Sequence, residues 1–413
     1  MSERQKRLSR REFIKTTGAA GIGSILTATG ALARESVESA NQGEGGQTVP
    51  TRPFGKSGEK VSILALGGDG NFWNRLMMRQ AIKWGVTFWD TWDSDRPAGG
   101  GISQSGVGKY FKEFPDDRKK VFVMSKTDDF DPESLTGSLD KSLEVMNVDH
   151  IDFFVIHSVW NVRNLNPEIR AWVDNAKSHG KIRYFGVSSH RNMEDVMFGA
   201  AKLGWVDGVM VTYNYRVMNG NHMKQAVRAC KESGLAIIAM KTQAASNWHD
   251  MGQENETAKK LTDTFIKKGY TLPQAKLKAV WQNSYIASIT SMMMNMTILK
   301  ANVEAALDRT KLSIKEQELL KRYAGETASN YCAGCGKICE SALSYCVPVS
   351  DVMRYLMYAR TYEDKEKGRH LFNQIPQDIQ RRLISTDYYP AETRCPQNMP
   401  IGRLMKEAVK ILA

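Results

Sequence analysis

The chain has 413 residues, of which 42% are hydrophobic and 25% charged. This composition is typical of globular proteins and excludes a disordered or fibrous chain. The length exceeds that of one small domain, so we expect a barrel-sized unit with an appendage. The formal net charge is +12, yet no basic stripe is interleaved with aromatic residues, so we expect a solvated basic surface and no nucleic-acid partner.

The first residues have the pattern of an export signal. Residues 9–15 (SRREFIK) match the twin-arginine pattern, a weakly apolar stretch follows, and Ala31-Leu-Ala33 suits a signal peptidase. We therefore predict a signal peptide over 1–33, a flexible polar linker over 34–50, and a periplasmic protein whose export partner is the twin-arginine machinery. The alternative is a transmembrane anchor, but its glycines and threonines are too polar to favour lipid, so we expect no stable membrane span.

From about residue 60, short apolar runs alternate with amphipathic stretches. Runs with few charges are typical of strands that are buried on both faces, as in a parallel sheet. Eight such strand–helix units predict an α/β fold, a (β/α)8 TIM barrel over 51–311. The expected strands are Ile63–Leu66, Thr87–Trp89, Val121–Met124, Ile151–Ile156, Tyr184–Val187, Val209–Thr212, Ala236–Met240 and Ala287–Thr290.

Several helices of the barrel have recognisable starts. Asp131-Pro132 and Asn166-Pro167 combine a capping residue with a proline at the first helical position. Residues 51–62, ahead of the first strand, predict a small hairpin that closes the floor of the barrel. The methionines of 292–296 are expected to fill the core beneath the last strand, with a copper(I) site as the alternative.

Ionisable side chains follow three consecutive strands. Asp90, Lys126 and His157 stand at the carboxyl ends of their strands, which in a parallel barrel is the edge that holds active sites. We expect them to meet there and to act on a carbonyl group. The alternative is a buried ion pair beside a core histidine without a catalytic role.

The chain resembles the aldo/keto reductase superfamily over 51–310, in an exported branch with a ferredoxin-like C-terminal extension. The matching segments are 52–62 (RPFGKSGEKVS), 85–91 (GVTFWDT), 148–157 (VDHIDFFVIH) and 180–189 (GKIRYFGVSS). The resemblance implies a catalytic tetrad of Asp, Tyr, Lys and His, with Asp90, Lys126 and His157 in three of its places. Asp95 stands where the family has Tyr, and an ionised carboxylate is a poor proton donor.

The resemblance also implies a nicotinamide cofactor. Ser188 and Ser189 would bind its carboxamide, and Asn302 lies in the matching last barrel helix. However, Met210 and Met240 replace polar and aromatic family residues, and Met294 replaces an arginine that binds phosphate. NADP(H) binding is therefore left open.

A second unit is expected over 312–413, where the pattern becomes helical and cysteines gather. Residues 332–339 (CAGCGKIC) resemble a ferredoxin run, with Gly for tight turns between closely spaced cysteines. These residues support one [4Fe–4S] cluster, whose ligands would be Cys332, Cys335 and Cys339 with Cys346 or Cys395 as the fourth. Structural zinc and disulfides are the alternatives.

Together these features predict an exported oxidoreductase of aldo/keto reductase type that acts on a small carbonyl or alcohol compound. His157 or a bound water would donate the proton, and a cluster would admit electrons from a redox partner. The alternatives are a catalytically silent barrel that binds a ligand or partner, and an iron–sulfur electron-transfer protein. The sequence names neither the substrate nor the oligomeric state.

Overall fold

The computed structural model describes residues 47–68, 73–92, 101–244, 256–362 and 364–413. The chain divides after Gln47, and the unit Thr48–Ala413 contains every element described below. The predicted signal peptide and residues 34–46 of the predicted linker lie outside the described residues.

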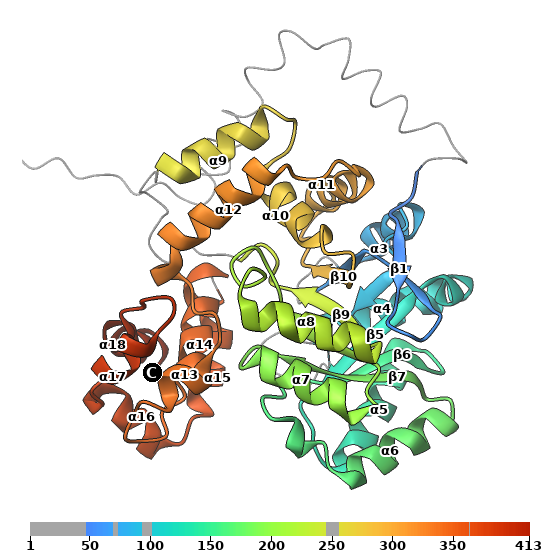
Figure 1. Ribbon diagram of the computed structural model, residues 1–413. Coiled ribbons are helices and arrows are strands. Elements are labelled where there is room, and N and C mark those ends of the chain that lie inside the picture. The colour runs from blue at the N-terminus through green and yellow to red at the C-terminus, as the bar shows by residue number, and fades with distance from the viewer. Residues whose placement is uncertain (1–46, 69–72, 93–100, 245–255, 363) are drawn as a thin grey trace, which may run out of the picture. The chain divides into compact units, whose positions relative to one another are not determined.

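Eight parallel strands close into a barrel (Figure 1), in the order β10-β3-β4-β5-β6-β7-β8-β9. Each strand lies on one of the eight runs expected from the sequence, so the predicted (β/α)8 barrel is confirmed. The strands are β3 (Leu64–Gly67), β4 (Phe88–Asp90), β5 (Phe122–Thr127), β6 (Ile151–Ile156), β7 (Ile182–Ser189), β8 (Gly208–Thr212), β9 (Ala236–Met240) and β10 (Ile286–Ser291).

The predicted hairpin forms as well. Strands β1 (Thr51–Pro53) and β2 (Lys60–Ser62) pair antiparallel. Between them, the ring of Phe54 is fully buried and packs against Phe122 and Phe153, with ring centroids 5.1 and 5.0 Å apart. The hairpin thus places an aromatic plug inside the barrel.

Helices cover the outside of the barrel, and their starts follow the local sequence. The Asp131 carboxylate accepts the amide of Ser134, and the Asn166 side chain accepts that of Ile169, as expected of N-caps. The helices are α3 (Arg75–Lys83), α4 (Gly101–Glu113), α5 (Pro132–Met146), α6 (Pro167–Ser178), α7 (Met193–Leu203), α8 (Asn221–Ser233), α9 (Glu256–Ile266), α10 (Leu272–Trp281) and α11 (Met296–Leu307), with 3-10 turns η1 (Pro115–Lys120) and η2 (Val162–Asn164).

The inside of the barrel is a packed core rather than a pore. Met124, Val155, Met210 and Ile238 are buried in one apolar cluster there. At Gly186 the barrel wall leaves no room for a side chain, since an added Cβ would lie 2.4 Å from the Gly208 carbonyl oxygen. A glycine at this point allows β7 and β8 to close around the interior aromatic rings.

After the barrel, the chain forms a helical extension with its own apolar core. Val352, Leu356, Phe372, Leu383 and Leu404 are buried together in that core. The elements are α12 (Ile314–Glu326), η3 (Ala328–Asn330), α13 (Gly336–Glu340), α14 (Val349–Thr361), α15 (Lys365–Asn373), α16 (Gln377–Ser385), α17 (Tyr389–Arg394) and α18 (Ile401–Leu412).

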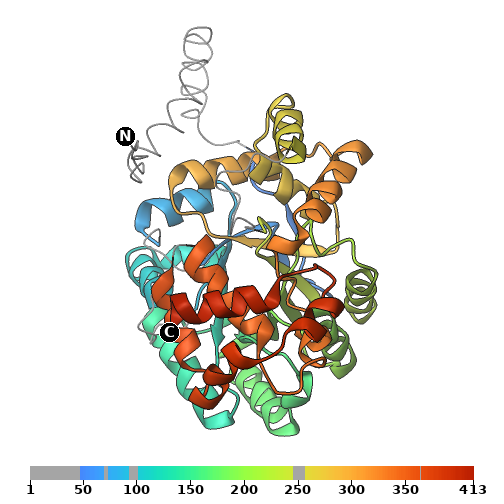
Figure 2. The same ribbon diagram turned by 90° about the vertical axis from the view of Figure 1, so that its left-hand side faces the viewer.

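The extension is joined to one end of the barrel. In Figure 2 the helices of the extension lie in front of that end. Arg191, just after β7, pairs with both Glu340 and Asp351 of the extension. The Asn192 amide donates to the carbonyl of Gly334 at 2.8 Å. The carboxyl ends of the strands are therefore the ends that the extension covers.

Within the described residues, no helix combines the length and apolar character needed to cross a membrane.

Candidate active site and cysteine cavity

The predicted Asp90 and Lys126 form a buried ion pair at the carboxyl ends of β4 and β5. Their side chains are only 4% and 9% exposed. The Lys126 ammonium also donates to the Thr91 carbonyl at 2.9 Å, and the Thr290 hydroxyl donates to Asp90 at 2.8 Å. A charge pair this well satisfied is held in a fixed geometry, whatever chemistry it serves.

His157 follows β6 on the same edge and links the barrel strands to one another. Its Nδ1 lies 2.8 Å from a carboxylate oxygen of Asp128, and its Nε2 lies 3.3 Å from Nε2 of His190. The ring also packs edge-on against Trp92, with centroids 4.7 Å apart. Burial lowers the pKa of His157 below its ordinary value, although the hydrogen bond to Asp128 acts in the opposite direction. A neutral imidazole in this position can exchange a proton with a bound substrate.

Several residues at this end of the barrel have left-handed backbone conformations, and two of them follow strand ends closely. Ser158 has φ of +56° and Lys241 has φ of +53°. Such conformations cost free energy in residues other than glycine and often accompany functional sites. Both residues come directly after strand ends, so the turns there set the direction of the neighbouring side chains.

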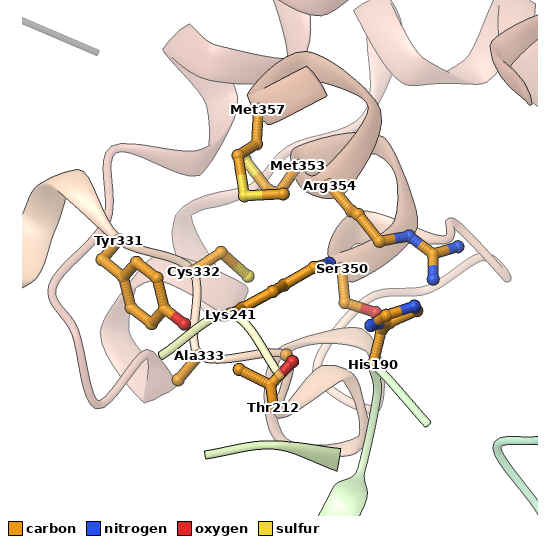
Figure 3. Close-up of a pocket in the computed structure, with 11 residues that line it drawn as sticks. His190, Thr212, Lys241, Tyr331, Cys332, Ala333, Ser350, Met353, Arg354 and Met357 are labelled. Atoms are coloured by element: carbon orange, nitrogen blue, oxygen red, sulfur yellow. The ribbon is translucent and has the colours of Figure 1, made fainter. Parts of the chain in front are cut away.

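A cavity lies between the strand ends and the extension, with about 440 Å³ of empty space counted out to open solvent. We call it the barrel-mouth cavity. Figure 3 shows the Lys241 side chain crossing it toward Ser350 and His190, with Met353 and Met357 on the other side. Its lining residues are His190, Thr212, Lys241, Tyr331, Cys332, Ala333, Gly334, Ser350, Met353, Arg354 and Met357.

Tyr358 joins this group from α14. Although burial alone would raise the pKa of Tyr358, the charges of Lys241, Arg354 and Lys367 lower it below its ordinary value. The Lys241 ammonium hydrogen-bonds to Tyr358 and lies 5.3 Å from the centroid of its ring. The barrel and the extension thus contribute to one polar group.

A second cavity of about 340 Å³, likewise counted out to solvent, lies inside the extension. Four thiols line it, from Cys332, Cys335, Cys339 and Cys395. Burial raises the pKa of Cys335 to about 11 and that of Cys339 to about 12. We call this the cysteine cavity. Thiols with such raised pKa values stay protonated unless a metal displaces the proton.

The sequence left open whether Cys346 or Cys395 is the fourth ligand, and the structure places these two cysteines differently. Cys395 lies on the cysteine cavity, whereas Cys346 is exposed and does not line it. All six cysteines are free, and among the residues the structure describes no group of three His, Cys, Asp or Glu is placed to hold a single metal ion. The cluster, zinc and disulfide alternatives of the sequence therefore all stay predictions.

The other predicted site residues lie at the expected edge with their polar atoms engaged. The Ser188 hydroxyl accepts the amide of Ser158, and the Ser189 hydroxyl donates to the carbonyl of Arg191. Asn302, buried in α11, donates to the Ser291 hydroxyl at 3.2 Å. Asp95 lies outside the described residues.

The expectation that the methionines of 292–296 fill the core is wrong for most of them. Met293 is fully buried, but Met292, Met294 and Met296 are exposed. They lie on the turn between β10 and α11 and in its first helical residue, where the chain has already left the barrel core.

Sequence reasoning missed part of the site. His190 and Lys241 come just after strand ends, as His157 does, and the same rule could have found them. Arg354 and Tyr358 lie four residues apart on α14 and carried no signal, because nothing local shows that this face covers the barrel.

Comparisons with known proteins agree with the architecture. The model of the aldo/keto reductase family matches residues 74–312. L-galactose dehydrogenase of Arabidopsis thaliana is 23% identical over 298 residues, which cover 66% of this chain and 92% of that protein. The aldo-keto reductase yakc [NADP(+)] of Schizosaccharomyces pombe is 26% identical over 47% of this chain and 58% of its own length. L-glyceraldehyde 3-phosphate reductase of Escherichia coli is 28% identical over 34% of this chain and 45% of its own length. Eight parallel strands in a closed barrel, together with a family match that spans most of that barrel, show that this chain belongs to the aldo/keto reductase family.

Proposed function

We propose that this protein is an exported oxidoreductase that acts on a small carbonyl or alcohol compound in the barrel-mouth cavity. Electrons would enter through one [4Fe–4S] cluster held by Cys332, Cys335, Cys339 and Cys395. The observation that carries the proposal is that the two cavities adjoin. Their shared lining consists of Cys332, Ala333, Ser350 and Met353.

The donor set fits a cluster. Iron–sulfur clusters of this type are held by four cysteine thiolates, and four thiols line the cysteine cavity. When bound, the cluster supplies one-electron transfer. Cys332 lines both cavities, so the cluster would lie beside the substrate.

His157 and the Asp90–Lys126 pair do not line the barrel-mouth cavity, but His190 does, and its Nε2 lies 3.3 Å from that of His157. The contact with Asp128 favours the His157 tautomer with its proton on Nδ1, so that Nε2 of His157 accepts the Nε2–H of His190. Reduction of a carbonyl compound takes two electrons, which would arrive one at a time from the redox partner, and two protons. The His157–His190 pair would give one proton to the oxygen, and solvent would give the other to the carbon. The Lys126 ammonium, whose charge acts on His157, would add positive charge at this edge of the barrel.

The nicotinamide route has weaker support. Relatives bear names that refer to NADP(+), L-galactose and L-glyceraldehyde 3-phosphate, which favours a small hydroxylated carbonyl compound as substrate. The Ser188 and Ser189 hydroxyls, however, are already engaged with the backbone. NADP(H) is therefore the competing electron source that an experiment must distinguish.

The twin-arginine pattern of residues 9–15 supports export to the periplasm. That pathway transports proteins already folded, which suits a chain that receives a cluster beforehand. It also suits an oxidoreductase that draws electrons from a protein redox partner instead of soluble NADPH.

The test is to purify the mature protein from the periplasmic fraction without oxygen and to measure iron, sulfide and the visible spectrum. We expect about four irons and four sulfides per chain. Cys395→Ser should lose the cluster, whereas the matched Cys346→Ser should keep it. NADPH titration of the same samples should show weak binding or none.

A colourless, iron-free protein in the periplasmic fraction would overturn electron entry through a cluster. Equal iron loss in both variants would overturn the assignment of Cys395. Tight NADPH binding by iron-free protein would indicate the ordinary nicotinamide route, and failure to bind either would favour a silent barrel.

A further inference from the structure

Basic groups gather where the extension covers the barrel mouth. Lys241 and Arg354 line the barrel-mouth cavity from opposite parts of the chain, the first after β9 and the second on α14. Lys367, on α15, lies 5.3 Å from the Tyr358 ring and 4.8 Å from the Trp92 ring. Burial and the charges of Arg354 and Lys367 lower the pKa of Lys241, and a bound anion would oppose that effect.

The acidic groups nearby are shared with other cations. Asp351 accepts from Arg354 at 3.2 Å and also from Arg191 at 2.9 Å. In the described part of the chain no carboxylate forms an ion pair with Lys241, whose hydrogen-bond partner is the hydroxyl of Tyr358. Counted over the described residues, the positive charge at the cavity therefore exceeds the negative charge that faces it.

Two buried polar atoms of cavity-lining residues have no hydrogen-bond partner. They are Nε of Arg354 and Nδ1 of His190. A buried donor or acceptor without a partner is destabilising, so each of these two atoms needs a partner from water or from a ligand. An oxyanion would offer acceptors to Arg354 and to Lys241.

We propose that the barrel-mouth cavity binds the oxyanion group of an acidic substrate, a carboxylate or a phosphate, between Lys241 and Arg354. Arginine and lysine recognise such groups by charge-assisted hydrogen bonds. Met353 and Met357 line the other side of the cavity, where the carbon skeleton would lie. The proposal names the substrate class of the proposed oxidoreductase and rests on that function, but the anion site can be measured without any turnover.

The extension supplies half of this recognition. Arg354 lies beyond residue 312, where the family match ends, so the site combines a barrel-strand end with a helix that the matched family region does not contain. Selectivity for acidic substrates would thus depend on the extension.

The test uses the full mature protein and calorimetric titration at constant ionic strength with inorganic phosphate, glycolate or neutral glycerol. We expect binding of one or both anions and none of glycerol. Lys241→Gln and Arg354→Gln should each weaken anion binding about tenfold or more. Lys337→Gln is the matched control, since Lys337 is 75% exposed, pairs with Asp195 and does not line the cavity.

Binding of phosphate alone or of glycolate alone would identify the oxyanion and support the site. No anion binding, or equal weakening in Lys337→Gln, would overturn it. Tight binding of NADPH with no binding of free anions would assign the cations to a cofactor and likewise overturn the proposal. Iron and sulfide content is measured on the same samples. It reports on the cluster alone, so a missing anion site can be told apart from a missing route of electron entry.

Discussion

Lys126 and Asp90, which the sequence predicts to be catalytic, form a buried ion pair. Their charges are removed from water almost completely, which is costly unless each has a partner of opposite charge. Each also has a further hydrogen bond, to Thr91 and Thr290. His157 differs because burial favours its neutral form. The barrel mouth thus places a fixed ion pair beside a group that can gain and lose a proton.

Replacement of Lys126 by Met should affect stability as well as turnover. It leaves the Asp90 carboxylate buried without a cation, so we expect a loss of about 3–5 kcal/mol in the free energy of unfolding. The double variant Asp90→Asn with Lys126→Met should recover part of this loss and none of the activity. Urea unfolding followed by circular dichroism measures both, and a single variant as stable as the parent protein would contradict the account.

The residues of the site were predictable to the extent that local rules apply. A charge directly after an apolar run placed Asp90, Lys126 and His157 at one edge, as found. The same rule reaches His190 and Lys241. Spacing could not choose between Cys346 and Cys395, because the fold of α13 to α18 brings Cys395 to the other three thiols. Nor could it assign Arg354 to the barrel mouth, since that contact depends on packing between distant segments.

Strand β6 carries an ionisable residue near each of its ends, Asp152 near its start and His157 just after its end. Asp152, near its start, accepts from Arg118 at 2.9 Å, from Arg183 at 2.7 Å and from the amide of Val123 at 2.8 Å. Burial would raise the pKa of Asp152, but these partners and His150 lower it to about 2. The charge of Asp152 is thus balanced by its cationic partners, whereas burial favours the neutral form of His157.

Asp152→Asn should therefore destabilise the barrel by about 2–3 kcal/mol at pH 7. Because the pKa of Asp152 is lower in the folded protein, its contribution is present above pH 4 and is lost as the pH falls toward 2. The variant should show a smaller decrease in stability than the parent over that interval. Unfolding by urea at a series of pH values measures this.

The matched control for that experiment is Asp116→Asn. Asp116 is 89% exposed and pairs with Lys119 three residues away, so its loss should change stability by less than about 0.5 kcal/mol. Equal effects of the two substitutions would contradict the stabilising role assigned to the buried Asp152 carboxylate.

Across the whole molecule, the extension is tied to the barrel by Arg191. Its guanidinium binds both Glu340 and Asp351 and lies 5.6 Å from the centroid of the Trp160 ring. Burial raises the pKa of Glu340, and the charge of Arg191 opposes that effect. One barrel residue thereby holds the two helices α13 and α14, which line the cysteine cavity and the barrel-mouth cavity.

Arg191→Gln should loosen the extension while the barrel stays folded. We expect a loss of about 1–3 kcal/mol in stability and faster hydrogen exchange in α13 and α14, with strands β5 and β6 still protected. Lys337→Gln, which removes an exposed pair to the same extension, should leave exchange unchanged. Equally faster exchange in the barrel strands would contradict a local role for Arg191.

The two cavities share lining residues, which has a consequence for how the sequence can vary. Under the two proposals above, a barrel with Lys241 at its mouth would have an incomplete anion site without Arg354, and a cluster on the four thiols would have no substrate to receive its electrons. Divergence among descendants of this gene should consequently alter the two segments in concert. A substitution at Ser350 or Met353 would alter both cavities, because each of these residues lines both.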